Sequence, residues 1–409
     1  MEPAAIETCT MPDVPDPPVP PKKRIAIFLD GTWNTVNDNT NVWRLKSLLA
    51  PVGTDKLEQL AYYSTGVGTT FGSRIRGGMF GYGLNDEIIR AYEWLIDHYN
   101  AGDELFIFGF SRGAYTARSL SGLISKCGLI VAGAPLSVGQ LYARYRRGST
   151  AKTIRDLLAA PQTEKATFGL EEHWILKYSQ AIDIEFLGVW DSVGALGLPF
   201  GNLPILGKSD MQFLNTGIRV SNKFAFHALA IDEHRKAFAP TLWTVDFANG
   251  APPPHHHRSL AQVEQRWFVG AHANVGGGCQ SDLLAQLPLK WMMDKAAKHR
   301  LAFRHAVEID EFKTPPAISD SYAEFMGGAY KLLTGGQAYY RDIGQDPFPS
   351  SATAMRESIN ETIDASVFER WKSDRDYRPR NLTRWAERRK VSIDTLTGAV
   401  RADDPSVPA

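Results

Sequence analysis

The segment that most constrains the fold of this chain is residues 105–115, where a strand-like apolar run leads into Gly109-Phe110-Ser111-Arg112-Gly113 and then into a helical pattern. A Gly-x-Ser-x-Gly sequence between a strand and a helix predicts a sharp turn that points the serine hydroxyl out of a sheet. Glycine is needed on both sides, because Cβ atoms there would collide with the adjoining strand and helix. With 35 glycines in the chain the pattern can arise by chance, but its flanks favour Ser111 as a nucleophile.

Strands and helices are predicted to alternate through most of the chain. Short apolar runs and alternating patterns predict strands at 25–29, 60–64, 104–110, 182–190, 237–245 and 265–269. Helical spacing of apolar residues predicts helices at 42–49, 84–99, 113–124 and 223–232. This alternation is typical of an α/β fold, with a mostly parallel sheet that is covered by helices on both faces.

The remaining segments are interpreted as additions to this core. Residues 1–22 form a Pro-rich lead-in without regular structure, residues 23–385 form one domain, and residues 386–409 form a tail. Insertions are expected at about 150–180 and 196–225, and the helical segments beyond Leu283 are expected to form a lid. The apolar stretches 79–82 and 196–200 could line a pocket for an acyl chain, although ordinary core is the simpler interpretation.

Composition excludes several classes of protein. The 45 basic and 45 acidic residues balance, so no overall field attracts nucleic acid, and transient contact with a membrane surface is the most that we expect. Three cysteines are too few for a disulfide framework or a cysteine-bound zinc site. The sequence has no secretory signal pattern and no apolar run long enough to span a membrane, which predicts synthesis in the cytoplasm and, for any export, a non-classical route.

A serine nucleophile needs a histidine base and a carboxylate that orients it. His272 follows the strand predicted at 265–269 and precedes a glycine run, so it can reach over the end of the sheet. The other histidines are weaker candidates: His227 and His234 fall on the predicted helix or just after it, and the cluster at 255–257 fits an exposed loop that is solvated or binds metal adventitiously.

The candidate acid is Asp191, which closes the strand predicted at 182–190, at the sheet edge where active-site residues of α/β proteins gather. The order Ser111, Asp191, His272 is the order found in α/β-hydrolases. Asp246, after the strand predicted at 237–245, is the main alternative acid, and Asp232 is a weaker one. Asp191 could also simply cap the turn that follows it.

The backbone N–H of Arg112 is the expected first oxyanion donor, because it lies at a helix N-terminus. Gly31 or Thr32 N–H, at the end of the first strand, is expected to be the second donor. Asp30-Gly31-Thr32 also resembles part of the turn of phosphatases with an aspartyl nucleophile. Phe28 occupies the position of that nucleophile, which argues against a phosphatase.

Taken in order, five segments resemble the α/β-hydrolase domain of bacterial type VI secretion phospholipase effectors. They are residues 28–34, 63–69, 109–114, 189–194 and 270–278, and residues 377–382 are similar to the closing motif of that family. The resemblance implies that Ser111, Asp191 and His272 form a catalytic triad, which favours Asp191 over Asp246. One departure is Asn274, where the family usually has aspartate.

The expected activity is hydrolysis of carboxylic esters, most of all lipid or phospholipid acyl esters, with no metal or organic cofactor. Two alternatives stay open at this point. The chain could be an inactive hydrolase fold that serves as a binding module, or an acyltransferase that uses the same triad.

Overall fold

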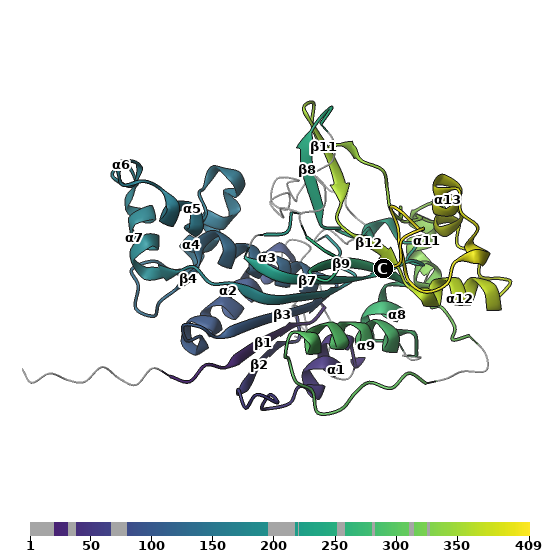
Figure 1. The fold of residues 1–409 in the computed structure, drawn as a ribbon, viewed down its shortest axis with the longest axis horizontal. Helices are drawn as coiled ribbons and strands as arrows, with labels where there is room; N and C mark the ends of the chain where they lie inside the picture. Colours follow the sequence, from purple (N-terminus) through teal and green to yellow (C-terminus); the bar gives the residue numbers. More distant parts are fainter. Residues whose placement is uncertain are drawn as a thin grey trace, which may run out of the picture.

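The computed structural model describes residues 20–31, 38–66, 80–194, 217–219, 221–251, 258–279, 283–310, 315–324 and 328–409. Its centre is an eight-stranded sheet with the order β13-β12-β9-β7-β6-β3-β1-β2 (Figure 1). The strands are β1 (Arg24–Leu29), β2 (Gln59–Ser64), β3 (Glu104–Phe110), β6 (Ile184–Trp190), β7 (Asn222–Ala230), β9 (Val263–Phe268), β12 (Glu361–Ile363) and β13 (Val400–Arg401). Every neighbouring pair is parallel except β12 and β13. The predicted mostly parallel α/β sheet is therefore confirmed.

Helices cover both faces of the sheet because its central strands are apolar on both sides. Ile25, Ile27 and Leu29 of β1 pack into one core with α2 (Phe80–His98) and α3 (Arg112–Cys127). Ala26 and Phe28 of the same strand face the opposite core, with α1 (Asn41–Leu48) and α9 (Leu283–Lys298). Alternate residues of a strand point to opposite faces, so a strand buried on both sides reads as a continuous apolar run.

The helix predicted at 223–232 is wrong. Residues 222–230 form β7, which lies between β6 and β9 in the middle of the sheet. The segment Phe224-Ala225-Phe226-His227-Ala228 contains residues compatible with either structure and has no polar stripe. A strand that is buried on both faces and a buried helix share this pattern, so apolar periodicity could not separate them.

Two further expectations need correction. The strand predicted at 237–245 is a short 3-10 helix (Lys236–Phe238), followed after a gap by β8 (Thr244–Ala248). Strand β8 is not part of the large sheet; it pairs with β11 (Ala354–Ser358), which also pairs with β10 (Phe348–Pro349). The first helix beyond residue 283, α9, packs on the sheet and against α1 rather than forming a lid.

The other elements lie around this core. On one side, α4 (Val138–Arg146), α5 (Ile154–Ala159), α6 (Gln162–Lys165) and α7 (Leu170–Tyr178) gather with the short strands β4 (Leu129–Ile130) and β5 (Ser179–Gln180) (Figure 1). On the other side are α10 (Ser321–Glu324), α11 (Ala329–Leu333), α12 (Ala365–Ser373) and α13 (Arg380–Arg389). The expected insertion at 196–225 falls largely outside the described residues, and its last positions belong to β7.

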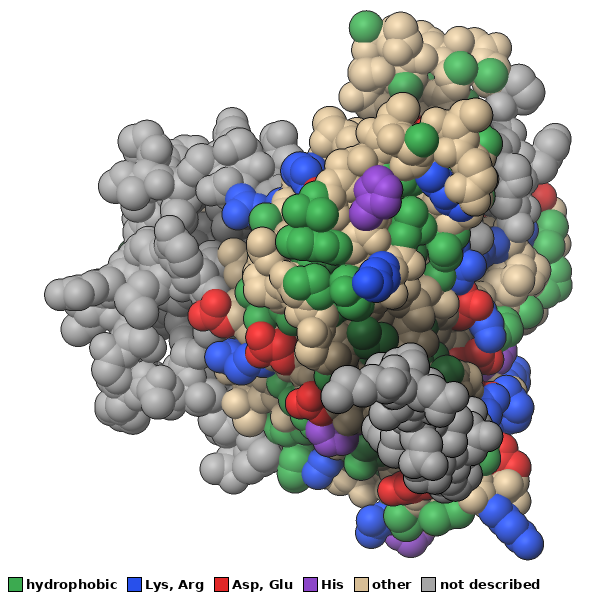
Figure 2. Space-filling model, turned by 90° about the vertical axis from the view of Figure 1, so that its left-hand side faces the viewer, with side chains coloured by type: hydrophobic (Ala, Val, Ile, Leu, Met, Phe, Trp, Pro, Cys, Tyr) green, Lys and Arg blue, Asp and Glu red, His purple; other side chains and the backbone are tan. Residues whose placement is uncertain are grey.

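The last third of the chain closes the sheet at one edge. Trp267 of β9 and Ile363 of β12 pack in a third core with Phe368 of α12 and Trp385 of α13. No helix within the described ranges is both long and apolar enough to cross a bilayer. On the face shown in Figure 2, acidic and basic side chains are intermixed, in keeping with the balanced charge of the chain.

Candidate active site

Ser111 occupies the sharp turn between β3 and α3. Its backbone has φ 58° and ψ −121°, a conformation that non-glycine residues rarely adopt. A Cβ atom at Gly113 would lie 2.1 Å from the carbonyl oxygen of Leu29, and a Cβ at Gly109 would lie 2.4 Å from that of Gly113. These contacts explain why the two glycines are required, because they let the chain turn tightly enough to hold the serine at the end of β3.

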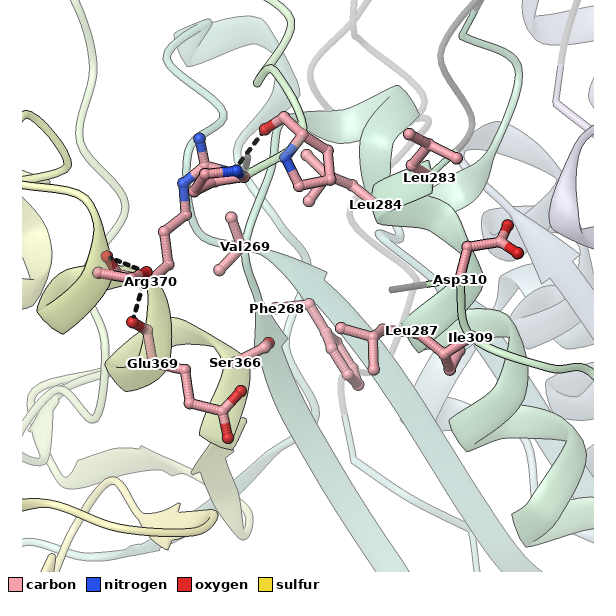
Figure 3. Close-up of a pocket in the computed structure, with 13 residues that line it drawn as sticks. Phe268, Val269, Leu283, Leu284, Leu287, Ile309, Asp310, Ser366, Glu369 and Arg370 are labelled. Atoms are coloured by element: carbon pink, nitrogen blue, oxygen red, sulfur yellow. Dashed lines mark hydrogen bonds between the residues drawn. The ribbon is translucent and has the colours of Figure 1, made fainter. Parts of the chain in front are cut away.

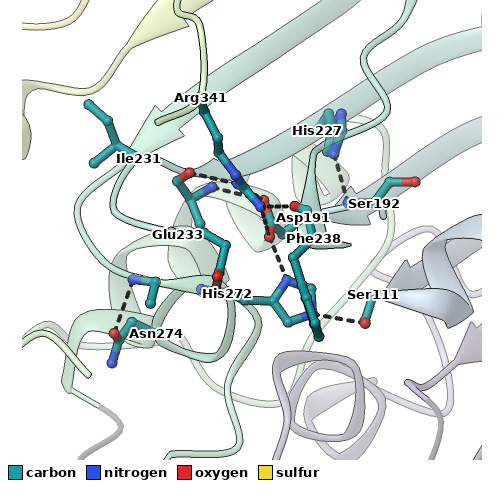
Figure 4. Close-up of polar contacts among 12 residues, drawn as sticks. Ser111, Asp191, Ser192, His227, Ile231, Glu233, Phe238, His272, Asn274 and Arg341 are labelled. Carbon is teal, nitrogen blue, oxygen red and sulfur yellow. Dashed lines mark hydrogen bonds and ion pairs between the residues drawn. The ribbon is translucent and has the colours of Figure 1, made fainter. Parts of the chain in front are cut away.

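His272 lies within hydrogen-bonding distance of Ser111, 161 positions away in the sequence. The imidazole Nε2 is 2.8 Å from Ser111 Oγ, and Nδ1 is 2.5 Å from Asp191 Oδ2 (Figure 4). His272 is the first residue of α8 (His272–Gly276), and its backbone N–H donates to Glu233 Oε2 at 3.2 Å. With a carboxylate at Nδ1, the proton of the neutral ring belongs on Nδ1, which leaves Nε2 to accept the hydrogen bond of Ser111.

Two aromatic rings enclose the imidazole. The centroid of Phe110 lies 4.8 Å from that of His272, and the centroid of Phe238 lies 5.0 Å away with the ring nearly perpendicular. His272 is 6% exposed and Ser111 is 8% exposed, so only a small part of each reaches the surface. This burial lowers the pKa of His272 below its usual value, against the opposing hydrogen bond and charge of Asp191.

Asp191 follows β6 directly and is completely buried. Its φ of 39° is again unusual for a non-glycine residue. Besides His272, the carboxylate accepts a hydrogen bond from Ala230 N–H at 3.0 Å. Arg341 contacts both carboxylate oxygens, with Nη1 2.6 Å from Oδ1 and Nη2 2.9 Å from Oδ2. Burial disfavours the charged form, but the charge of Arg341 and the hydrogen bond of His272 hold the pKa of Asp191 below its usual range.

The structure thus brings together the three residues that the sequence singled out, and adds Arg341 and Glu233, which sequence reasoning missed. Arg341 lies in an irregular segment between α11 and β10, without a motif or periodic pattern. Glu233 binds Arg235 through both carboxylate oxygens at 2.8 Å. Burial opposes its ionisation, but the hydrogen bonds and charge of Arg235 lower the pKa of Glu233 to about 2. The only available signal was that a buried carboxylate needs a cationic partner, which does not say where in the chain that partner lies.

The structure describes two of the three expected oxyanion donors, Arg112 and Gly31. Arg112 is the first residue of α3, the helix end that carries partial positive charge. Gly31 N–H donates to Asp30 Oδ1 at 2.8 Å, so in this arrangement it is already engaged. Thr32 lies outside the described residues. Asp30 is itself fixed by hydrogen bonds from Thr40 Oγ1 at 2.5 Å and Tyr63 Oη at 3.0 Å.

Neither alternative acid contacts the imidazole of His272 in any described interaction. Asp246 is in β8, where both of its carboxylate oxygens pair with Arg356 on the neighbouring strand, at 2.7 and 2.9 Å. Asp232 accepts hydrogen bonds from the backbone of Gly270 at 2.7 Å and from Tyr377 Oη at 3.2 Å. Burial raises the pKa of Asp232 to about 6. Its contacts support the loop before His272 rather than the imidazole.

Asn274, at the position where the resemblance leads one to expect aspartate, organises the loop that carries His272. Its Oδ1 accepts from Ala271 N–H at 3.1 Å and from Ser319 N–H at 3.0 Å, and its Nδ2 donates to Ser319 Oγ at 3.1 Å. The amide therefore uses both its acceptor and its donor, whereas an ionised carboxylate could only accept.

His227 and His234, the other described candidates, make their hydrogen bonds away from Ser111, His234 with the carbonyl of Tyr339 at 3.1 Å. His227, which the sequence placed on a helix, is buried in β7 and accepts a hydrogen bond from Ser192 N–H at 3.0 Å. Burial, and then the charge of Arg118, lower the pKa of His227 to about 3, so it remains neutral. The cluster at 255–257 lies outside the described residues. Within the part of the chain that the structure describes, no three histidine, cysteine or acidic side chains come together as a metal site.

A cavity of about 330 Å³ lies between β9, α9 and α12 (Figure 3). Its wall is mainly apolar, with Phe268, Leu284 and Leu287 on one side and Arg370 on the other. None of Ser111, Asp191 and His272 lines it. The stretches 79–82 and 196–200, which the sequence suggested for an acyl pocket, lie outside the residues whose side chains are described.

Comparison with known proteins gives a family and distant structural relatives. The family model "T6SS, Phospholipase effector Tle1-like, catalytic domain" matches residues 23–295, more than half of the chain. An uncharacterized protein of Saccharomyces cerevisiae is 26% identical over 243 residues, which cover 54% of this chain and 33% of the yeast protein. The match thus spans about a third of the length of that relative.

Two solved structures are similar at low identity. One is an uncharacterized protein from Pseudomonas aeruginosa, with 18% identity and a TM-score of 0.42 over 69% of this chain and 46% of that one. The other is the Tle1 effector bound to the VgrG spike of the type VI secretion system, with 16% identity and a TM-score of 0.31 over 63% of this chain and 52% of that one.

Proposed function

The chain belongs to the Tle1-like family of type VI secretion phospholipase effectors, matched over the catalytic domain, and on that premise we propose that it is a serine hydrolase of lipid acyl esters. Membership of a phospholipase effector family supports the hydrolysis of lipid esters as the general activity. The finer proposal is that Ser111, His272 and Asp191 form the triad and that the reaction passes through an acyl-enzyme. Its main support is the continuous chain of hydrogen bonds from Ser111 Oγ through His272 to Asp191, at 2.8 and 2.5 Å.

In the first half of the proposed reaction, Ser111 Oγ attacks the ester carbonyl carbon while its proton passes to His272 Nε2. The carbonyl oxygen becomes an oxyanion, for which Arg112 N–H is one proposed donor. Gly31 or Thr32 N–H is the proposed second donor; in the case of Gly31, its hydrogen bond to Asp30 would first have to open. When the tetrahedral intermediate collapses, the bond to the alcohol oxygen breaks and that oxygen takes the proton from His272. Ser111 is left acylated.

In the second half, water attacks the acyl carbon and gives its proton to His272. Collapse of the second intermediate breaks the bond to Ser111 Oγ, which regains the proton, and the carboxylic acid leaves. Asp191 stays ionised throughout and stabilises the imidazolium that forms twice in each cycle. The low pKa of Asp191 and the lowered pKa of His272 suit these two roles.

An active-site-directed fluorophosphonate tests the triad directly. We expect wild-type protein to be labelled, and Ser111→Ala and His272→Ala to lose labelling and turnover by a factor on the order of 10³ or more. Ser125→Ala is the matched control, because Ser125 lies on α3 and donates to the carbonyl of Ser121, away from the turn. Failure of the folded wild-type protein to react would favour the inactive binding module.

Substrates separate the two enzymatic alternatives. A series of p-nitrophenyl esters of increasing acyl length, tested beside phospholipid vesicles, gives the chain-length preference and shows whether phospholipids are cleaved. We expect free fatty acid as the product. Transfer of the acyl group to an added alcohol in preference to water would instead favour the acyltransferase.

A further inference from the structure

The most unusual feature of the site is the pair formed by Asp191 and Arg341. Both side chains have no exposed surface, and their contact is bidentate, at 2.6 and 2.9 Å. A carboxylate at such depth needs a countercharge, and without Arg341 the group left to supply it is the imidazole of His272, by taking up a proton. The pair therefore decides whether the charge of Asp191 is balanced while the imidazole stays neutral.

The guanidinium of Arg341 is held in place by more than Asp191. Nη1 also donates to the carbonyl of Ala230 at 2.6 Å, and Nη2 donates to the carbonyl of Phe238 at 2.6 Å. Ala230 in turn donates its N–H to Asp191 Oδ1, so the end of β7 contacts both partners. Arg341 Nε has no hydrogen-bond partner among the described residues. The planar end of the side chain thus spans two carbonyls and two carboxylate oxygens, which a lysine ammonium could not do.

The charges around His272 come from several elements. Asp191 comes from the segment after β6, and Arg341 from the segment before β10. The segment after β7 supplies Asp232, Glu233 and Arg235. His227 of β7 contacts Ser192, the residue next to Asp191. Glu233 is already paired with Arg235. Arg341 pairs with Asp191 in the same way. Each carboxylate that contacts His272 therefore has its own arginine, and the environment of the imidazole is close to neutral.

On the proposed function, we propose that Arg341 is a positioning residue, which fixes the Asp191 carboxylate towards His272 and offsets its charge so that the imidazole stays an unprotonated base. Arg341 contacts neither Ser111 nor His272 in any described interaction, so it acts through Asp191. The charge and the geometry of the guanidinium make separable contributions.

Removing the positive charge favours the protonated imidazole, because Asp191 would then attract a proton on His272 without compensation. The acid limb of the pH–rate profile is expected to move to higher pH by about one unit in Arg341→Met. Arg341→Lys keeps the charge but loses the bidentate contact. We expect its acid limb to stay near that of the wild type while its rate at high pH falls about tenfold or more.

The matched control is Arg144→Met. Arg144 is 1% exposed and pairs with Glu171 and Glu172 in the α4–α7 region. Its loss removes a buried arginine and should lower the melting temperature, but it should leave the acid limb where it is. A role of Arg341 that is only structural would give the same result as this control.

The experiment measures the rate of fluorophosphonate labelling and the NMR titration of the His272 imidazole in the full-length protein, with far-UV circular dichroism to verify folding. A raised imidazole pKa in folded Arg341→Met supports the inference, and an unchanged titration overturns it. If Arg341→Met does not fold, Arg341→Lys decides: a labelling rate within about twofold of the wild type overturns the positioning role, and a larger loss with an unmoved acid limb supports it. An unlabelled wild-type protein would count against the proposed function, while the imidazole titration would still test the effect of Arg341.

Discussion

Asp191 and Asp246 were the two leading candidates among the acids, and each pairs through both carboxylate oxygens with an arginine guanidinium. Asp191 and Arg341 are both fully buried. Asp246 and Arg356 are 49% and 35% exposed and lie on the small sheet formed by β8, β10 and β11. The same chemical pair therefore occurs once inside the molecule, in contact with a histidine, and once at its surface. Burial and the third partner, rather than the ion pair itself, distinguish the acid of the proposed triad.

The largest contrast is expected in catalysis. Asp191→Asn removes the charge that stabilises the imidazolium and can impose the wrong histidine tautomer, so kcat/KM should fall by a factor on the order of 10³ to 10⁴. Asp246→Asn should change kcat/KM less than about twofold. Ester hydrolysis by the two variants measures both. Near-normal activity of Asp191→Asn would remove Asp191 from the triad.

The second contrast concerns the free energy of unfolding. Asp191→Ala leaves Arg341 buried without its carboxylate, which typically costs about 3–5 kcal/mol. Asp246→Ala breaks a solvent-screened pair, which typically contributes about 0–1 kcal/mol. Urea unfolding followed by tryptophan fluorescence gives both values. Equal losses would mean that the buried pair stabilises the fold no more than the exposed one.

Acid is expected to reduce the contribution of each ionised aspartate to the free energy of unfolding. The pKa of both aspartates is lowered in the folded protein. At Asp191 burial raises the pKa, but the charge of Arg341 and the hydrogen bond of His272 outweigh it; at Asp246 the hydrogen bond of Arg356 lowers the pKa. A lowered pKa stabilises the folded state above the ordinary aspartate value of 3.8, and this stabilisation is lost as the pH falls through the folded-state value. The stability gap between wild type and Asp191→Asn should therefore narrow as the pH falls from about 5 to about 3. A gap that widens instead would contradict the sign of the shift.

Salt should produce the smallest effect. Raising the ionic strength to about 1 M shortens the screening length to about 3 Å and should remove most of the small contribution of Asp246 and Arg356. The buried pair is shielded from ions, so the difference between wild type and Asp191→Ala should hardly change. Paired urea titrations at low and high salt test this point.

These contrasts also show what the sequence could and could not predict. The turn at Ser111 was predictable because a local pattern, two glycines and a strand-to-helix junction, dictates it. His272 and Asp191 were predictable from their positions after strands, and the resemblance to a family favoured Asp191 over Asp246. The structure gives the physical reason that the sequence lacked: β8, which carries Asp246, pairs outside the large sheet.

The misses have physical causes as well. Residues 222–230 form a central strand whose two buried faces leave no periodic signal, so a helix was predicted. Arg341 has no local signature, since its role depends on a carboxylate 150 positions earlier. Glu233 and Asn274 act through hydrogen bonds to backbone N–H groups, which residue patterns do not encode.

Asp191 and Arg341 are 150 positions apart in the sequence, which has a consequence for biosynthesis. At a translation rate of roughly 5–20 residues per second, 150 residues take about 8 to 30 seconds to be added. During that interval a nascent chain already carries Ser111 and Asp191, but the arginine that pairs with Asp191 does not yet exist. The charge network of the site is therefore completed only once Arg341 has been added, and a shorter nascent chain lacks it.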